Sequence, residues 1–225
     1  LCEEKITLKN LPYLQDITTM FELLGSMGSE ILLDENMNFT ISSSNLNDIE
    51  ARYELVKTMR ASILVLGPLL AKYGKARIAL PGGCAIGSRP VNYHLDALKL
   101  MGAEIKLKNG YIEASAKKLI GNTIRFDGIT VTGTENLMMA ATLAEGRTTL
   151  SNVAKEPEII DLAEMLNSMG ARISGAGTEE IIIDGVNILH GTEFSIPADR
   201  IEAGTYLAAA AVTNGDITVD GIDPN

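Results

Sequence analysis

The sequence has few of the residues that build metal sites and disulfide frameworks. Its 225 residues include two cysteines, Cys2 and Cys84, and two histidines, His94 and His190. Neither cysteine belongs to a CxxC pair, and the histidines lack the spacing of metal ligands. We therefore expect no metal site built from these residues and no disulfide framework, and a reducing cytoplasm is the favoured compartment.

Basic residues and long apolar runs are also scarce. The 19 basic and 29 acidic side chains give a net charge of -10, and no basic stripe or tail is present. This balance argues against nucleic acid or an anionic membrane surface as the main partner, although a local arginine cluster can still bind a small anion. No apolar run is long enough to span a bilayer, and the first residues lack the features of a signal peptide.

One helix-and-strand pattern occurs three times. Residues 20–31, 95–105 and 162–173 each predict a helix that ends on Met-Gly and is followed at once by a strand. Glycine at this point suits the left-handed cap of a helix. A further strand precedes each helix, at residues 5–9, 76–80 and 147–150, and a hairpin follows it, at residues 30–42, 104–115 and 171–184.

The full unit reads β-α-β-α-β-β. Its first helix, predicted at residues 53–73 and 135–144, is apolar over much of its circumference, and we expect Gly67-Pro68 to kink or divide the former. Helices that are apolar all round are buried. The predicted fold is therefore an inside-out α/β (α+β) domain, with central helices and outer sheets.

The repeats divide the chain at about 1–47, 48–118 and 119–190, and residues 191–225 begin a further unit. That unit is predicted to contain a strand at 194–196, a helix at 201–212 and a strand at 216–219. We expect residues 1–225 to form one domain. A segment of a longer protein, with a second domain outside this chain, is favoured over a chain with irregular ends.

The second repeat has an unusual connection between its strand and its helix. Residues 81–90 read PGGCAIGSRP and place three glycines, Cys84 and Arg89 between the two elements. Glycine lets backbone amides approach a ligand, and a helix N-terminus and an arginine both favour anions. From the residues alone the segment is either a tight turn with an inert cysteine or an anion site. The corresponding turns of the other repeats, at 10–12 and 152–154, contain neither glycine nor cysteine, which favours the site.

These features together resemble the enolpyruvyl transferases. The resemblance rests on the PGGCAIGSRP segment within three such repeats, and on the stretches YELVKTMRAS (53–62), AATLAEG (140–146), EPEIID (156–161) and DRIEAGT (199–205). It covers essentially the whole chain. The cysteine segment separates it from the members that act on shikimate phosphate.

The resemblance implies a bacterial cytoplasmic enzyme that needs no cofactor. Its reaction moves the enolpyruvyl group of phosphoenolpyruvate to the 3-hydroxyl of UDP-N-acetylglucosamine, with release of phosphate. This reaction is the committed step of peptidoglycan biosynthesis, and hence of cell-wall biogenesis, cell shape and cell division. Two domains close over the substrates, and this chain resembles the domain that carries the cysteine.

The resemblance also assigns the catalytic roles. Cys84 matches the general acid at the vinyl carbon of phosphoenolpyruvate, which fosfomycin alkylates. Arg89 matches a residue that contacts both substrates, which suits a guanidinium because it binds phosphate and carboxylate bidentately. The alternative for Arg89 is a surface arginine that stiffens the segment. Cys2 matches nothing and is expected to be incidental.

The remaining site residues are expected to bind UDP-N-acetylglucosamine. Arg60 matches a residue of that site, the alternative being a salt bridge to Glu54 or to another acidic residue. Thr130, Val131 and Thr132 are expected to precede the helix and contact the diphosphate. The uridine ring is expected at Pro90, Val91, Asn92 and Tyr93.

The chain departs from the family pattern at some of these positions. Many members have Asp-Leu in place of Asn92-Tyr93, and some have a lysine in place of Gly128. His94 is either a residue that orients the site or a satisfied helix histidine, and Glu156 and Glu158 are expected to support the fold.

Two other functions remain open. The chain could be a nucleotide-sugar-binding or structural domain without turnover, or a transferase that acts on shikimate phosphate. The chain by itself is expected to be inactive, because the lysine, asparagine, aspartate and arginines of the family's other half have no counterpart here.

Overall fold

The structure is a computed structural model that describes residues 1–80 and 91–222. Three of the predicted site residues, Cys84, Arg89 and Pro90, lie outside the described residues. Within the described ranges, no helix is long and apolar enough to cross a membrane.

The strands form three four-stranded sheets that share one topology. The first sheet has the strand order β12 (Glu193–Ser195), β1 (Ile6–Lys9), β3 (Phe39–Ser42) and β2 (Glu30–Leu33). The second has the order β4 (Glu50–Ala51), β5 (Lys75–Ala79), β7 (Tyr111–Ser115) and β6 (Glu104–Lys108). The third has the order β8 (Thr123–Arg125), β9 (Arg147–Ser151), β11 (Glu180–Asp184) and β10 (Arg172–Ser174). In each sheet the first strand pairs parallel with the second, and the other pairs are antiparallel. The three sheets therefore confirm the predicted threefold repeat.

The first sheet takes its opening strand from the far end of the chain. Thr7 of β1 pairs with Glu193 of β12, just as Arg77 pairs with Glu50 and Thr149 with Thr123 in the other sheets. The strand predicted at 194–196 exists, but it completes the first repeat. The segment from residue 191 thus returns to the first sheet before it continues into a helix.

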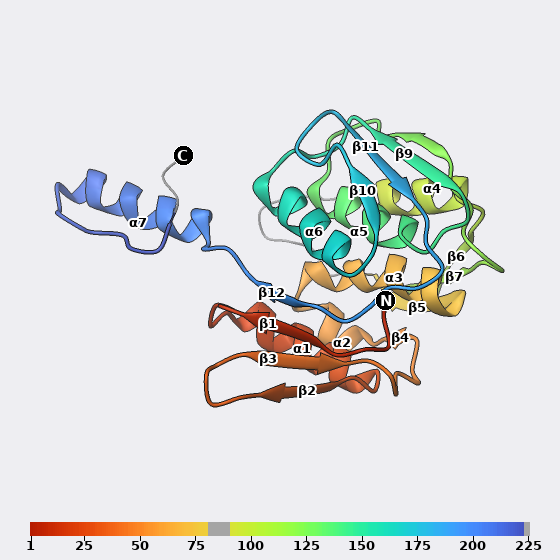
Figure 1. Cartoon of the computed structure of the whole chain (residues 1–225), viewed down its shortest axis with the longest axis horizontal. Helices are drawn as coiled ribbons and strands as arrows, with labels where there is room; N and C mark the ends of the chain where they lie inside the picture. The colour runs from red at the N-terminus through yellow and green to blue at the C-terminus, as the bar shows by residue number, and fades with distance from the viewer. Residues whose placement is uncertain (81–90, 223–225) are drawn as a thin grey trace.

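The helices lie between the sheets, apart from the last one. They are α1 (Gln15–Ser26), α2 (Tyr53–Val56), the 3-10 helix η1 (Arg60–Val65), α3 (Leu66–Tyr73), α4 (Asn92–Leu100), α5 (Val131–Ala141), α6 (Pro157–Ser168) and α7 (Arg200–Thr213). Figure 1 shows α3 and α5 in the middle of the molecule with the strands of the three sheets around them. Leu66, Leu70, Leu137 and Met138 of these two helices are fully buried. The central helices and outer sheets agree with the predicted inside-out fold.

The helix predicted at residues 53–73 is divided in two places. It is interrupted between Val56 and Arg60, which the sequence did not suggest, and the 3-10 helix η1 gives way to α3 just before Gly67-Pro68, which lies in the first turn of α3. A proline in the first turn removes no helical hydrogen bond, so the helix continues through it. The amide of Gly67 donates to Oδ1 of Asn136 in α5 over 2.7 Å, which fixes α3 against α5.

The start of α5 also differs from the prediction. The helix begins at Val131, not Glu135, because Oγ1 of Thr130 accepts from the amide of Gly133 over 3.2 Å and caps it. Val131 and Thr132 therefore belong to the first helical turn and do not precede it.

The end of the chain leaves the three sheets. Figure 1 shows α7 projecting away from them, and its side chains Tyr206, Leu207 and Val212 are 59%, 53% and 84% exposed. The strand predicted at 216–219 is wrong, because these residues are not part of a strand. A strand requires a neighbouring strand for its backbone hydrogen bonds, and no sheet of the described chain extends to this segment.

Candidate functional site

The described site residues belong to the first turns of three helices. Val91 caps α4, whose first residues are Asn92 and Tyr93. Thr130 caps α5, which opens with Val131 and Thr132. Arg60 is the first residue of η1.

Tyr93 connects the start of α4 to the loop before α5. A Cβ atom on Gly128 would lie only 2.7 Å from Oη of Tyr93 and 3.3 Å from Cζ, so a larger residue there would displace the end of the Tyr93 side chain. The half-buried phenol of Tyr93 therefore stands beside the residues that lead into Thr130, and its neighbour Asn92 is exposed. The structure thus brings one of the predicted uridine residues, Tyr93, close to the predicted diphosphate residues.

The first turn of α5 presents backbone donors. The carbonyl of Thr130 already accepts from the amide and from Oγ1 of Thr134, over 3.0 and 2.8 Å. The amides of Val131 and Thr132 belong to the first turn, where an α-helix provides no partner for its N–H groups. Together with the helix dipole, these donors suit a phosphate oxygen.

His94 lies behind this turn and is 1% exposed. Its Nδ1 is 3.0 Å from Nδ2 of Asn136, and its Nε2 is 3.3 Å from Oγ1 of Thr132. Asn136 is also buried, and its Nδ2 donates to the carbonyl of Ile63 over 3.1 Å. His94 is thus a satisfied histidine that also contacts a predicted site residue, so the two alternatives left by the sequence are not exclusive.

Burial, and to a smaller extent the positive charge of Arg60, lower the pKa of His94 to about 4. The imidazole is therefore neutral at physiological pH. The guanidinium of Arg60 is thus close enough for its charge to act on the imidazole of His94. Glu54, the partner that the sequence offered for Arg60, forms an ion pair with Lys57.

Asn136 was missed by the sequence reasoning. The helical pattern around it is apolar, and the only available signal was an amide side chain within that pattern. Its hydrogen bonds to α3, η1 and α4 make it the connection between the helices that carry the site.

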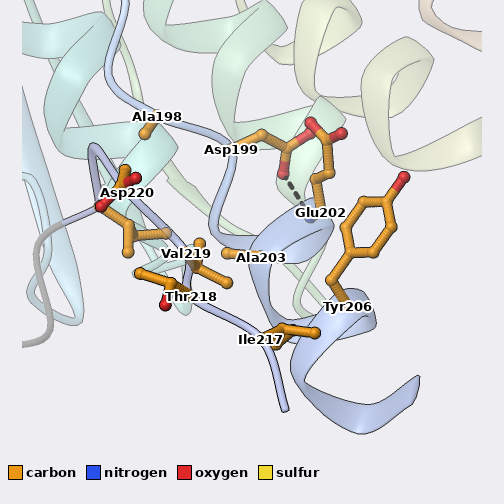
Figure 2. Close-up of a pocket in the computed structure, with 10 residues that line it drawn as sticks. Ala198, Asp199, Glu202, Ala203, Tyr206, Ile217, Thr218, Val219 and Asp220 are labelled. Carbon is orange, nitrogen blue, oxygen red and sulfur yellow. Dashed lines mark hydrogen bonds between the residues drawn. The ribbon is translucent and has the colours of Figure 1, made fainter. Parts of the chain in front are cut away.

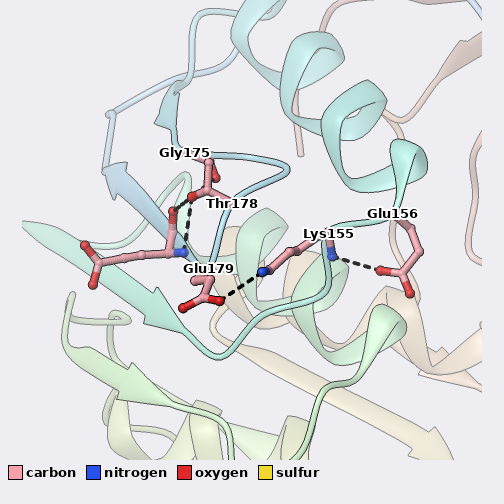
Figure 3. Close-up of polar contacts among 6 residues, drawn as sticks. Lys155, Glu156, Gly175, Thr178 and Glu179 are labelled. Carbon is pink, nitrogen blue, oxygen red and sulfur yellow. Dashed lines mark hydrogen bonds and ion pairs between the residues drawn. The ribbon is translucent and has the colours of Figure 1, made fainter. Parts of the chain in front are cut away.

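Glu156 and Glu158, at the start of α6, serve the fold as expected. Oε2 of Glu156 accepts from the amide of Lys155 over 2.9 Å, and Lys155 reaches Glu179 over 3.1 Å (Figure 3). Glu158 forms a bidentate pair with Arg200, over 2.9 and 3.0 Å. Burial and the charges of Glu158 and Glu156 raise the pKa of Glu135, one turn into α5.

A hollow of about 490 Å³ lies between α7 and the residues that follow it, away from the predicted site residues. Figure 2 shows Asp199 and Glu202 on its wall on the side of Tyr206, and Asp220 on the opposite side. Asp199 accepts from the amides of Ile201 and Glu202 and so caps α7. Three carboxylates around one hollow disfavour an anionic ligand there.

Cys2 is 4% exposed, and its Sγ donates to the carbonyl of Glu4 over 3.3 Å. Its side chain thus packs in the core. Among the described residues, no group of three or more His, Cys, Asp or Glu could hold a metal ion.

The fold and the whole-chain match define the class of this protein. The chain belongs to the EPSP synthase (3-phosphoshikimate 1-carboxyvinyltransferase) family, which matches residues 1–225. The enolpyruvyl transferase NikO from Streptomyces tendae has the same fold, with a TM-score of 0.80 at 22% identity over 93% of this chain and 50% of that one. An EPSP synthase from Acinetobacter baumannii gives a TM-score of 0.77 at 20% identity over 100% of this chain and 52% of that one.

Within this class, two similar curated proteins carry the same name. The UDP-N-acetylglucosamine 1-carboxyvinyltransferase of Hydrogenovibrio crunogenus is 57% identical over 100% of this chain and 54% of its own length. That of Ruthia magnifica is 60% identical over 96% of this chain and 52% of its own length. The chain therefore spans about half the length of the curated relatives that it matches.

Proposed function

We propose that this chain is one domain of a transferase that moves the enolpyruvyl group of phosphoenolpyruvate to the 3-hydroxyl of UDP-N-acetylglucosamine. The observation that carries the proposal is the identity of 57% over the whole chain to a protein named for this activity. The neighbours of the shikimate-phosphate type are about 20% identical and support the fold alone.

The first turns of α4, α5 and η1 supply the nucleotide-sugar half of the site. The amides of Val131 and Thr132 and the guanidinium of Arg60 suit the two phosphate groups, because they offer N–H donors and positive charge in an otherwise acidic protein. Asn92 and Tyr93, with Pro90 and Val91, are proposed for the uridine ring, which needs amide and aromatic contacts.

Cys84 and Arg89 are proposed as the catalytic residues, on the basis of the sequence. An ordinary thiol holds a transferable proton near neutral pH. The thiol of Cys84 gives this proton to the terminal carbon of phosphoenolpyruvate while the 3-hydroxyl oxygen bonds to the adjacent carbon, and a base in the rest of the protein takes the hydroxyl proton. The resulting ketal loses phosphate, and loss of a proton from the new methyl group restores the double bond. Arg89 neutralises the anionic groups of the substrates.

The remainder of the enzyme is proposed to lie in a second domain, because the relatives are about twice as long as this chain. We propose that residues 1–225 bind the nucleotide sugar but do not turn over by themselves. In the cell, the enzyme would act in the bacterial cytoplasm at the committed step of peptidoglycan biosynthesis, and so in cell-wall formation, cell shape and cell division.

Fosfomycin labelling of the full-length protein tests this function. We expect mass spectrometry to find one adduct on the peptide that contains Cys84. We also expect Cys84→Ala to lower phosphate release with UDP-N-acetylglucosamine at least 100-fold, because a positioned general acid contributes about 10²–10⁴-fold. Cys2→Ala is the matched control, and it should still be labelled at Cys84.

Two results would contradict the proposal. One is an unmodified Cys84 peptide under conditions in which the protein is folded. The other is turnover with shikimate 3-phosphate and none with UDP-N-acetylglucosamine, which would identify the shikimate-phosphate type. Binding of the nucleotide sugar without any turnover by the full-length protein would support a binding domain instead.

A further inference from the structure

We propose that His94 is a positioning residue, which orients the hydroxyl of Thr132 so that its proton points toward the bound substrate. This inference rests on the proposed function and assigns a role to a buried side chain that does not itself reach the substrate. Three observations carry it: the fixed orientation of Asn136, the single tautomer that this orientation allows for His94, and the position of Thr132 in the first turn of α5.

The amide of Asn136 can adopt only one orientation. The amide N–H of Gly67 approaches its Oδ1 at 2.7 Å, and the carbonyl oxygen of Ile63 lies 3.1 Å from its Nδ2. A flipped side chain would place donor against donor at Gly67 and acceptor against acceptor at Ile63, and both contacts are buried. Nδ2 must therefore face His94.

This orientation determines the tautomer of His94. Because Nδ2 of Asn136 is a donor, Nδ1 of His94 at 3.0 Å must accept. The imidazole is neutral, so its one proton is on Nε2. Nε2 then donates to Oγ1 of Thr132 at 3.3 Å.

The hydrogen bond from His94 determines the direction in which the hydroxyl proton of Thr132 points. A hydroxyl has one proton and two lone pairs, and one lone pair of Thr132 is used by His94. Its proton therefore points away from the imidazole. Thr132 is half-buried and sits in the helical turn whose amides are proposed to bind phosphate, so the hydroxyl adds a third donor to the two backbone N–H groups.

A purely structural role for His94 would require only the contact with Asn136. Two substitutions separate the roles. His94→Asn places an amide oxygen near the position of Nδ1 and keeps an acceptor for Asn136, but it has no donor that reaches Thr132. His94→Gln places an amide N–H near the position of Nε2 and keeps the donor to Thr132, but it loses the Nδ1 acceptor.

The test uses steady-state kinetics of the full-length protein with UDP-N-acetylglucosamine as the varied substrate. We expect Thr132→Val to raise KM for UDP-N-acetylglucosamine about tenfold, because it removes a hydrogen bond to a charged group. His94→Asn should raise it about three- to tenfold with kcat within about twofold, and His94→Gln should restore a nearly normal KM. In the Thr132→Val background, His94→Asn should have no further effect, since the two residues act as one unit.

Some results of these experiments would contradict the inference alone, and others would contradict the proposed function as well. The inference would be overturned if His94→Asn raised KM for UDP-N-acetylglucosamine equally in the unaltered and the Thr132→Val proteins. A larger KM for His94→Gln than for His94→Asn would also overturn it. An Nδ1–H tautomer of His94 in ¹⁵N NMR of the unliganded protein at neutral pH would also overturn it. Absence of turnover by the unaltered full-length protein would overturn the proposed function together with the inference, whereas normal turnover with additive variants would overturn the inference alone.

Discussion

The second strand of each sheet, which is β1, β5 or β9, ends in one of two ways, and the difference separates the second repeat from the other two. After β1 and β9 the chain turns at Asn10 and Asn152, which have φ values of 56° and 57°. Each side-chain amide donates over 2.8 Å to a carbonyl just beyond the opening strand, that of Ile196 or that of Phe126. The register places Leu80 at the equivalent position after β5.

The acceptor has also changed in the second repeat. The residue equivalent to Ile196 and Phe126 is Tyr53, which opens α2, and its carbonyl accepts from the amide of Lys57 over 2.9 Å. Both partners of the asparagine contact are thus replaced where the cysteine segment follows in the sequence. The fold uses the asparagine turn where the connection only joins strand to helix, and omits it where catalytic residues are proposed.

The helices that follow differ at one position as well, which is fully buried in the second repeat and half-buried in the other two. Counted back from the Met-Gly at the helix end, Met20 and Leu162 are equivalent to His94. Two repeats therefore place an apolar side chain where the second repeat places an imidazole that contacts Asn136 and Thr132.

The largest expected effect comes from making the second repeat like the third with His94→Leu. His94 has a pKa of about 4 in the folded protein and 6.5 ordinarily, so the unfolded chain binds more protons between these values. The contribution of His94 to the free energy of unfolding is therefore fully present above pH 6.5. It falls by about 3 kcal/mol as the pH is lowered from 6.5 to 4.

Urea unfolding at pH 7, 5.5 and 4 measures this loss. The leucine variant should be less stable at pH 7, because Asn136 loses an acceptor, but its free energy of unfolding should fall less steeply with acid. The carboxylates are common to both proteins and cancel in the difference. Equal slopes for the two proteins would show that His94 does not titrate as expected.

A smaller effect is expected from making the third repeat like the second with Asn152→Leu. The substitution removes a part-buried hydrogen bond, worth about 1 kcal/mol, and places leucine in the left-handed region at a further cost of about 1 kcal/mol. We expect the free energy of unfolding to fall by about 2 kcal/mol in urea melts.

Two matched variants separate these contributions. Asn152→Gly keeps the backbone conformation and should lose about half as much. Asn10→Leu acts on a solvent-exposed hydrogen bond and should cost less than Asn152→Leu. No difference between the leucine and glycine variants would mean that the left-handed turn is not maintained by the asparagine.

Local signals in the sequence were sufficient for the repeats and for the pairing within hairpins. Asn109-Gly110 predicted strands at 104–108 and 111–115, and β6 and β7 have these bounds because both turn residues adopt positive φ, 51° and 77°. The way in which Gly67 packs depends on a contact with another element, Asn136 of α5, whereas the early start of α5 rests on the local cap that Thr130 forms with Gly133.

The candidate site was predictable as residue types but not as geometry. Arg60, Tyr93 and Thr132 could be selected from the sequence, whereas the packing of Tyr93 over Gly128 and the contact of His94 with Thr132 join segments that are distant in the chain. The missing strand at 216–219 has the same origin, since its residues have strand propensity but no neighbouring strand in the described chain.

The smallest expected effect is that of Leu80→Asn, which gives the second repeat the asparagine of the other two. The equivalent carbonyl, that of Tyr53, is already engaged within α2, so the new amide should find no acceptor there. Leu80 is partly buried against the core, and the loss of its packing should lower the free energy of unfolding by about 1 kcal/mol. Urea melts of Leu80→Asn and Leu80→Ala should then give similar values. If Leu80→Asn were instead more stable than the unaltered protein, the backbone of the second repeat could still form the asparagine turn. The strand end of the second repeat would then differ from the other two in one side chain alone.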